Sequence, residues 1–160
     1  MEEMIIELTS APVPGHGWGI VLLRLSLAIL LGALIGWERE SRNKHAGLRT
    51  HVMIALAACL FALITLAMML SPISDDDSIR KDPIRLIEAV TAGVAFLAAG
   101  TIFTRRGDVK GLTTGAGMWL AGAVGVACGL GQIGLAVVAT VLALVVLRLF
   151  KVVEPRADRT

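Results

Sequence analysis

Long apolar runs separated by short charged segments dominate this sequence. A helix needs about 20 apolar residues to cross a hydrocarbon core of about 30 Å, so runs of that length can be counted directly. Five runs qualify, and they predict transmembrane helices at 18–37, 52–70, 84–103, 112–130 and 133–150. Little more than Gly131 and Gln132 separates the last two, which indicates an antiparallel hairpin. We therefore expect an all-α integral membrane protein, a compact bundle of five transmembrane helices.

Composition supports this class, because 56% of the 160 residues are hydrophobic and the chain contains no tyrosine. That mixture is too apolar for an ordinary soluble domain of this size. The net charge of +2 is informative only once the charges are placed along the chain. Nearly all of them fall between the long uncharged runs.

The distribution of lysine and arginine predicts the orientation, since short cytoplasmic loops retain these residues. The loops after the first and third runs and the C-terminal tail are basic, with Arg39, Arg42, Lys44, Arg49, Arg105, Arg106, Lys110, Lys151, Arg156 and Arg159. On the opposite side, Arg80, Lys81 and Arg85 share a loop with Asp75, Asp76, Asp77 and Asp82. We expect an extracytoplasmic segment at 1–17, a membrane domain at 18–150 and a cytoplasmic tail at 151–160. Acidic residues and a short apolar stretch argue against a signal peptide at 1–17.

Small residues recur every four positions along three of the predicted helices, a spacing that lets helix backbones approach closely in lipid. The glycines concerned are Gly32, Gly36, Gly93, Gly100, Gly117, Gly125 and Gly129. They are expected either to pack helices within one protomer or also to form the seam of a homo-oligomer.

Two ionisable residues, Arg24 and Glu88, lie within apolar runs, where charges are costly and usually point to the bundle interior. At 1.5 Å per residue both lie roughly 7–9 Å from the outer helix ends. They could pair with each other across the bundle. Alternatively, Arg85 could pair with Glu88 on the same helix face while Arg24 reaches toward lipid headgroups, or the two charges could serve translocation.

A dense charge cluster follows the first helix. Glu38 precedes Arg42 and Glu40 precedes Lys44 by four residues, the favourable helical order, so the helix is expected to continue for about two turns as a self-paired stalk that ends at Gly47. Arg39 has no helical partner in this scheme.

Several other polar residues are expected at the same membrane surface as Arg39. Together with Glu38 and Arg39 they form one candidate site, consisting of Glu38, Arg39, Arg49, Thr50, Thr113 and Thr114. Such a set could bind an anion, a lipid headgroup or a partner protein, or it could lock the inner end of the bundle.

The sequence offers no constellation for catalysis: HExxH, GxSxG and Walker A patterns are absent, and the three histidines are scattered. We therefore expect no enzyme, no catalytic residues, no metal site and no cofactor. The basic loops match what inward membrane loops carry, so they do not indicate nucleic-acid binding.

The stretch LLGALIGWERESRNKHAGLRTH at 30–51 resembles the hallmark of the MgtC/SapB family of bacterial inner-membrane proteins. The blocks DPIRLIEAVTAGVAFLAAGTIF and VKGLTTGAGMWLAGAVGVACGLG are similar to the third and fourth helices of that family. Alanines replace two glycines usual in the family, at Ala95 and Ala98, and Gly115 replaces an alanine. Since the chain ends about ten residues after Phe150, the short form without a C-terminal cytosolic domain is expected.

The resemblance implies a multi-pass protein of the bacterial inner membrane linked to low-magnesium adaptation and virulence, with modulation of the membrane ATP synthase in the family's namesake. It points to Arg24, Glu38, Arg39, Gly47, Leu48, Arg49, Thr50, Gly93, Phe96, Gly100, Gly111, Leu112, Thr113 and Thr114. We expect a regulatory protein that binds another membrane complex, with membrane lipid and a membrane protein or a second copy as partners. The alternatives are a small homo-oligomeric ion or solute transporter or channel and, less favoured, an enzyme acting on a lipid.

Overall fold

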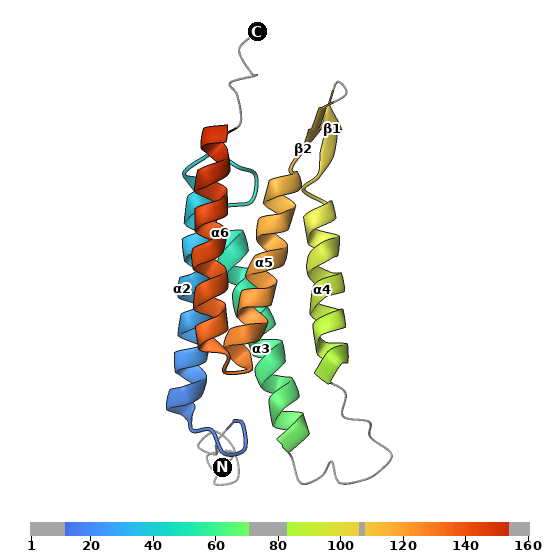
Figure 1. The fold of residues 1–160 in the computed structure, drawn as a ribbon. Coiled ribbons are helices and arrows are strands. Elements are labelled where there is room, and N and C mark those ends of the chain that lie inside the picture. The colour runs from blue at the N-terminus through green and yellow to red at the C-terminus, as the bar shows by residue number, and fades with distance from the viewer. Residues whose placement is uncertain (1–11, 71–82, 106–107, 154–160) are drawn as a thin grey trace.

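Seven regular elements make up the part of the chain that the computed structural model describes, which is residues 12–70, 83–105 and 108–153 (Figure 1). Five are helices and two form a short antiparallel β-hairpin. In chain order they are α2 (Trp18–Glu40), α3 (Leu48–Leu70), α4 (Pro83–Ala99), β1 (Phe103–Arg105), β2 (Asp108–Lys110), α5 (Leu112–Gly129) and α6 (Ile133–Val153).

Helix α3 is held between α2 and α5, and glycines make these contacts possible. A Cβ atom at Gly32 of α2 would lie 2.8 Å from the Cβ of Ala55, and one at Gly36 would lie 2.7 Å from the Cα of Leu48. From the other side, a Cβ at Gly125 of α5 would lie 2.2 Å from the carbonyl oxygen of Ala55. The backbones are therefore too close for any larger residue at these positions.

The other helices add to this three-helix centre from its edges. Helix α6 follows α5 after a tight turn at Gly131 and packs against both α5 and α2. Helix α4 packs mainly against α5 and only loosely against α3, so it forms the outer edge of the bundle (Figure 1). Val13, in the turn before α2, is buried and belongs to the same core.

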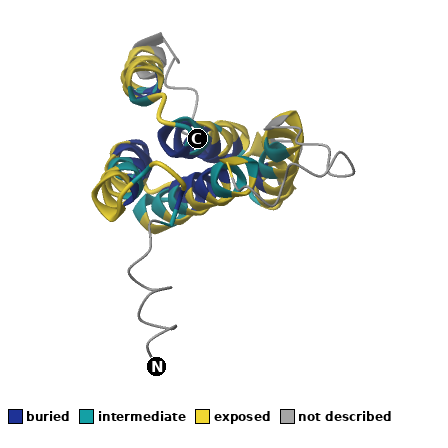
Figure 2. Ribbon diagram, turned by 90° about the horizontal axis from the view of Figure 1, so that it is seen from below, coloured by how far each residue is buried: buried dark blue, intermediate teal, exposed yellow. Residues whose placement is uncertain are grey.

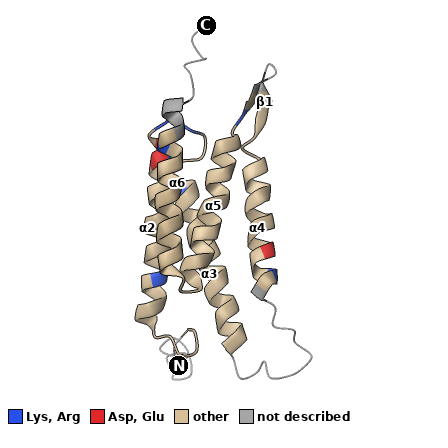
Figure 3. Cartoon of the chain, in the orientation of Figure 1, with Lys and Arg blue, Asp and Glu red and all other residues tan. Residues whose placement is uncertain are grey.

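The outside of the bundle is apolar. Buried residues face the other helices, whereas large hydrophobic side chains such as Leu22, Phe61 and Leu142 are exposed on the outer faces (Figure 2). Three helices, α2, α3 and α5, are long and apolar enough to cross a membrane. Charged residues gather toward the ends of the helices and are sparse along their middles (Figure 3). An apolar outer surface with charged ends suits lipid as the surrounding solvent.

Helix α3 begins at Leu48 and not at 52, and α6 runs to Val153 and not to 150. Two further predictions about helix ends are wrong. Helix α4 ends at Ala99 and not at Phe103, which is the first residue of β1, and no strand was predicted. Helix α2 ends at Glu40, because Asn43 adopts a positive φ of 52° and the chain turns back toward α3. The two-turn stalk that was expected beyond Trp37 therefore does not form.

At two of the seven packing glycines, an added Cβ atom would meet no other helix among the described residues. A Cβ at Gly93 would meet nothing within 4 Å, and one at Gly100 would meet only the carbonyl oxygens of Leu97 and Phe96 in its own helix end. The expectation of tight packing within the protomer is wrong at these positions. The predicted outer loop with its charges at 75–82, residues 1–11, Arg106 and the tail residues 154–160 lie outside the described residues.

Candidate functional site

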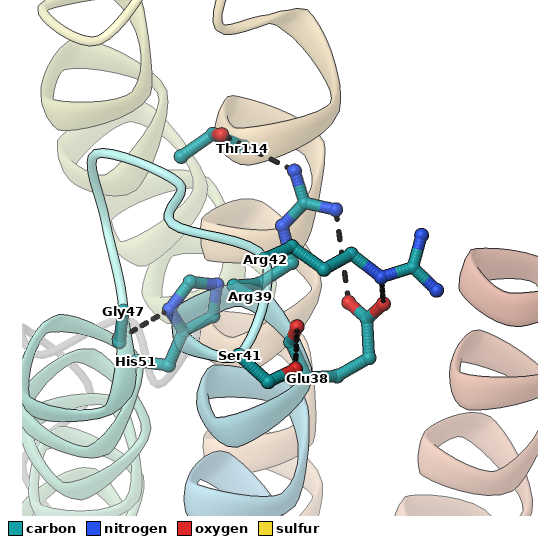
Figure 4. A network of polar contacts seen from close by, with 7 residues as sticks. All are labelled: Glu38, Arg39, Ser41, Arg42, Gly47, His51 and Thr114. Carbon is teal, nitrogen blue, oxygen red and sulfur yellow. Dashed lines mark hydrogen bonds and ion pairs between the residues drawn. The ribbon is translucent and has the colours of Figure 1, made fainter. Parts of the chain in front are cut away.

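Arg39, in the last turn of α2, is the centre of a buried polar cluster where α2, α3 and α5 meet (Figure 4). Its side chain is only 4% exposed. Nη2 donates a hydrogen bond of 3.3 Å to Oγ1 of Thr114, which is itself buried in the first turn of α5. The residue that lacked a helical partner in the sequence thus finds one on a different helix.

Glu38 supplies the negative charge of this cluster. Its carboxylate, 5% exposed, lies 3.7 Å from Nη1 of Arg39 and makes a closer ion pair with Nε of Arg42, one helical turn further on (Figure 4). Two guanidinium groups thus share one carboxylate, so positive charge is left over at this end of the bundle. Removing one partner of a buried ion pair strongly destabilises the fold, because the other charge is left buried without compensation.

His51 lies beneath the Arg39 cluster and is fully buried. Its Nδ1 donates a hydrogen bond of 2.8 Å to the carbonyl oxygen of Gly47, one turn earlier. A Cβ at Gly117 of α5 would lie 3.1 Å from Nε2, so α5 closes over the ring. In the described part of the chain Nε2 has no hydrogen-bond partner. The sequence does not indicate a site at His51, because the three histidines are scattered along the chain. The position of His51 beside Arg39 becomes visible only through the contact between α3 and α5.

The loop from α2 to α3 is fixed by Glu40. Its Oε2 accepts a hydrogen bond of 2.7 Å from the backbone N–H of Leu48, at the start of α3. Gly47 leaves room for this side chain, since a Cβ there would lie 2.6 Å from the same oxygen. The ion pair expected between Glu40 and Lys44 does not form, because α2 has already ended.

The structure brings together only part of the predicted site. Glu38, Arg39 and Thr114 form the cluster, and Thr113 lies exposed beside it at the start of α5. Arg49 is exposed and Thr50 half-buried on α3. Neither side chain makes a hydrogen bond or ion pair with a described residue, so nothing in the structure links these two to Arg39.

Arg24, toward the opposite end of α2, has a different partner from those expected. Its Nη1 donates a hydrogen bond of 2.8 Å to the carbonyl oxygen of Gly129, at the C-terminus of α5. Cations stabilise helix C-termini, where carbonyl groups lack intrahelical partners. The guanidinium also fills the space beside Gly131, since a Cβ there would lie 2.7 Å from Nη2.

Glu88 lies on the exposed side of α4, a helix that packs against α5 and α3. It forms no salt bridge with Arg24, and none with its neighbour Arg85, among the described side chains. The ion pair considered across the bundle and the local pair on α4 are therefore both wrong.

A groove of about 600 Å³ runs between α3 and α4 on the side of the bundle. Its lining is apolar except for Thr65, and it includes four small residues, Ala57, Ala58, Ala89 and Gly93. Gly93, where an added Cβ atom would meet nothing within 4 Å among the described residues, therefore borders an open apolar groove. Glycine and alanine here leave space that larger side chains would fill.

The comparisons with known proteins agree on one family. The family model described as MgtC family matches residues 25–156. An uncharacterized protein of Haemophilus influenzae is 36% identical over 155 residues, 96% of this chain and 64% of the relative. The putative magnesium transporter YhiD of Escherichia coli is 38% identical over 129 residues, 81% of this chain and 60% of the relative. Protein MgtC of Brucella abortus is 43% identical over 122 residues, 76% of this chain and 48% of the relative.

This chain spans about half to two thirds of the length of these relatives. No solved structure shows significant similarity to it.

Proposed function

The chain belongs to the MgtC family, and from this premise we propose that it is a regulatory, non-enzymatic protein that acts by binding another membrane protein. We place it in the bacterial inner membrane with five crossings, the N-terminus outside and the C-terminus in the cytoplasm. The basic end that carries Arg39 and Arg42 then faces the cytoplasm, in accord with the retention of arginine and lysine on that side.

The groove between α3 and α4 carries this proposal. Its occupant is a transmembrane helix of the partner protein. Helices associate in lipid through close backbone approach, and Ala57, Ala89 and Gly93 offer a surface without side-chain bulk. The loose contact between α3 and α4 means that this approach does not require the bundle to open.

Tight packing of the centre supports binding over transport. Between α2, α3 and α5 there is no room for even a methyl group at Gly32, Gly125 or Gly129. An ion path through the centre of one protomer would have to open this contact, where Cys59 and Ala62 also close the space. A protein that binds a partner at its side needs no such path.

Site-specific photo-crosslinking in native membranes tests the proposal. A photoreactive residue at Ala57 or Ala89 is expected to crosslink to one discrete membrane protein, identified by mass spectrometry. The matched control is Val138, which is exposed on α6 and faces away from the groove. Gly93→Leu, which fills the groove, is expected to abolish the crosslink without lowering the melting temperature.

If the groove positions crosslink only to a second copy of this chain, the groove is a self-association site and the proposed partner protein is wrong. If they crosslink only to lipid, the proposal is overturned. The proposal is also overturned if Val138 crosslinks to the same protein as the groove positions do.

Transport is the second candidate, because one relative is named a putative magnesium transporter. A path between protomers of a homo-oligomer would avoid the closed centre of the bundle. Liposomes that contain only this protein would then show magnesium, proton or other ion flux. Flux that Glu88→Gln abolishes would favour this candidate, and its absence across an ion panel would eliminate it.

A further inference from the structure

A pocket of about 540 Å³ lies next to the Arg39 cluster, between the loop from α2 to α3, strand β2 and the first turn of α5. Its lining includes Arg39, Lys44, His45, Lys110, Thr113 and Thr114. No acidic side chain lines it among the described residues. The rings of His45 and Phe103 meet edge to face at 5.3 Å, which joins the loop to the hairpin beside the pocket.

The N-terminus of α5 forms one wall of this pocket. Gly111 precedes the helix in the left-handed conformation, with φ of 93°, and supplies no side-chain cap. A Cβ there would lie 2.0 Å from the carbonyl oxygen of Thr101, so only glycine fits. The first intrahelical bond runs from the N–H of Gly115 to the carbonyl of Gly111. The N–H groups of the preceding turn are therefore left for an anion, which the helix dipole also attracts.

Arg39 is an independent observation that points to the same ligand. Arg39 is only 3% exposed, and its Nε has no hydrogen-bond partner among the described residues. Among the described side chains, the carboxylate that pairs with Arg39 is that of Glu38, which is shared with Arg42 and lies closer to that residue. A buried cationic N–H without an acceptor is costly, and the guanidinium that carries it belongs to a residue lining the pocket, where its uncompensated charge attracts an oxyanion.

We propose that this pocket binds a phosphate group. The residues that line it offer the guanidinium of Arg39, the backbone N–H groups of Leu112 and Thr113, the hydroxyl of Thr113, and the ammonium groups of Lys44 and Lys110. A tetrahedral oxyanion matches this set because each of its oxygens can accept more than one hydrogen bond. The phosphate belongs to an anionic lipid headgroup or to a free phosphate compound at the membrane surface. The pocket shares no residue with the groove between α3 and α4, so the two proposals stand or fall separately.

The test uses the full chain and two probes. In mild detergent, inorganic phosphate is titrated while the melting temperature is followed by tryptophan fluorescence, with chloride at equal ionic strength as the reference. In nanodiscs of phosphatidylcholine with or without phosphatidylglycerol, native mass spectrometry counts the phosphatidylglycerol molecules that stay bound after release from the disc.

The decisive variant is the double substitution Lys44→Gln with Lys110→Gln. Both side chains are exposed and make no hydrogen bond or ion pair with a described residue, so their loss does not disturb the fold. Arg49→Gln is the matched control, because Arg49 is an exposed basic residue near the same end of the bundle that does not line the pocket.

We expect the double substitution to weaken binding by about tenfold for each lost charge-assisted hydrogen bond, and Arg49→Gln to leave it unchanged. A response to phosphate assigns a free phosphate compound, and retention of phosphatidylglycerol alone assigns the lipid headgroup. The proposal is overturned if neither probe binds, if the double variant binds as the parent does, or if Arg49→Gln weakens binding equally.

Discussion

Arg39 of α2 and Thr114 of α5 are joined by a buried hydrogen bond of 3.3 Å between residues 75 positions apart in the sequence. The bond ties the last turn of one helix to the first turn of another at the charged end of the bundle. Both residues also line the proposed phosphate pocket. The sequence leaves open whether this polar cluster locks the inner end of the bundle or binds a ligand. In the structure both roles involve the same arginine.

Thr114→Val should destabilise the bundle. Valine keeps the shape of the buried threonine but removes the acceptor, leaving Arg39 with a further unsatisfied donor. Hydrogen bonds to charged groups contribute about 1.5–3 kcal/mol, so we expect a loss in that range. The measurement is thermal unfolding in detergent. Thr113→Val is the control, because its exposed hydroxyl makes no bond with a described residue, and an equal loss there would remove the role assigned to Thr114.

Glu38→Gln should cost more than Arg42→Gln. Glutamine at 38 leaves Arg39 and Arg42 together without a counter-charge, and breaking a buried ion pair costs about 3–5 kcal/mol. Arg42 is 23% exposed, so water can screen the charge left when it is replaced, and a smaller loss is expected. Equilibrium unfolding of the two variants under the same conditions gives the order. The reverse order would mean that Glu38 is not held by both arginines.

Gly125→Ala tests the close contact between α5 and α3. The added methyl group would lie 2.2 Å from the carbonyl oxygen of Ala55, so the helices must separate. Overpacking of this kind costs about 1–3 kcal/mol. Gly93→Ala is the matched control within the same bundle, since it meets nothing within 4 Å and alanine favours the helix. We expect a lower melting temperature for the first variant and an unchanged or higher one for the second.

Much of the architecture follows from local sequence patterns. Apolar runs of sufficient length indicate helices, and glycines at four-residue spacing, such as Gly125 and Gly129, lie where α5 meets α3. The ion pair between Glu38 and Arg42 follows from their spacing on one helix. Each of these features depends on residues within a few turns of one another.

Features that depend on tertiary contacts were not predictable. The partner of Arg24 is a backbone carbonyl, which any residue carries, so no pattern of side chains indicates it. The strands β1 and β2 are three residues long each, and β1 begins at Phe103, the last residue of an apolar run that indicates a helix. Lys110 and Arg39 line one pocket only because α5 begins beside the end of α2.

Arg24 and Glu88 should be energetically independent. Arg24 donates to the carbonyl of Gly129, whereas Glu88 is exposed on a helix at the other edge of the bundle, so removing one charge should not change the effect of removing the other. Arg24→Gln is expected to cost about 1–3 kcal/mol, because a partly buried charge-assisted hydrogen bond is lost. Glu88→Gln should not lower stability, because Glu88 has no salt-bridge partner among the described side chains and lies in an apolar run where a charge is costly.

A double-mutant cycle measures this independence directly. The changes in unfolding free energy caused by substitutions at residues without a shared partner add to within about 0.3–0.5 kcal/mol. Arg24→Gln combined with Glu88→Gln should therefore show a coupling energy no larger than that. Unfolding free energies of the parent, the two single variants and the double variant in one detergent give the coupling. Hydrogen exchange at Leu130 and Gly131 should rise in Arg24→Gln alone, because the C-terminus of α5 loses its cation. A coupling above about 1 kcal/mol would contradict this independence, because couplings of that size arise between residues that touch or share a network, a cavity or a backbone shift.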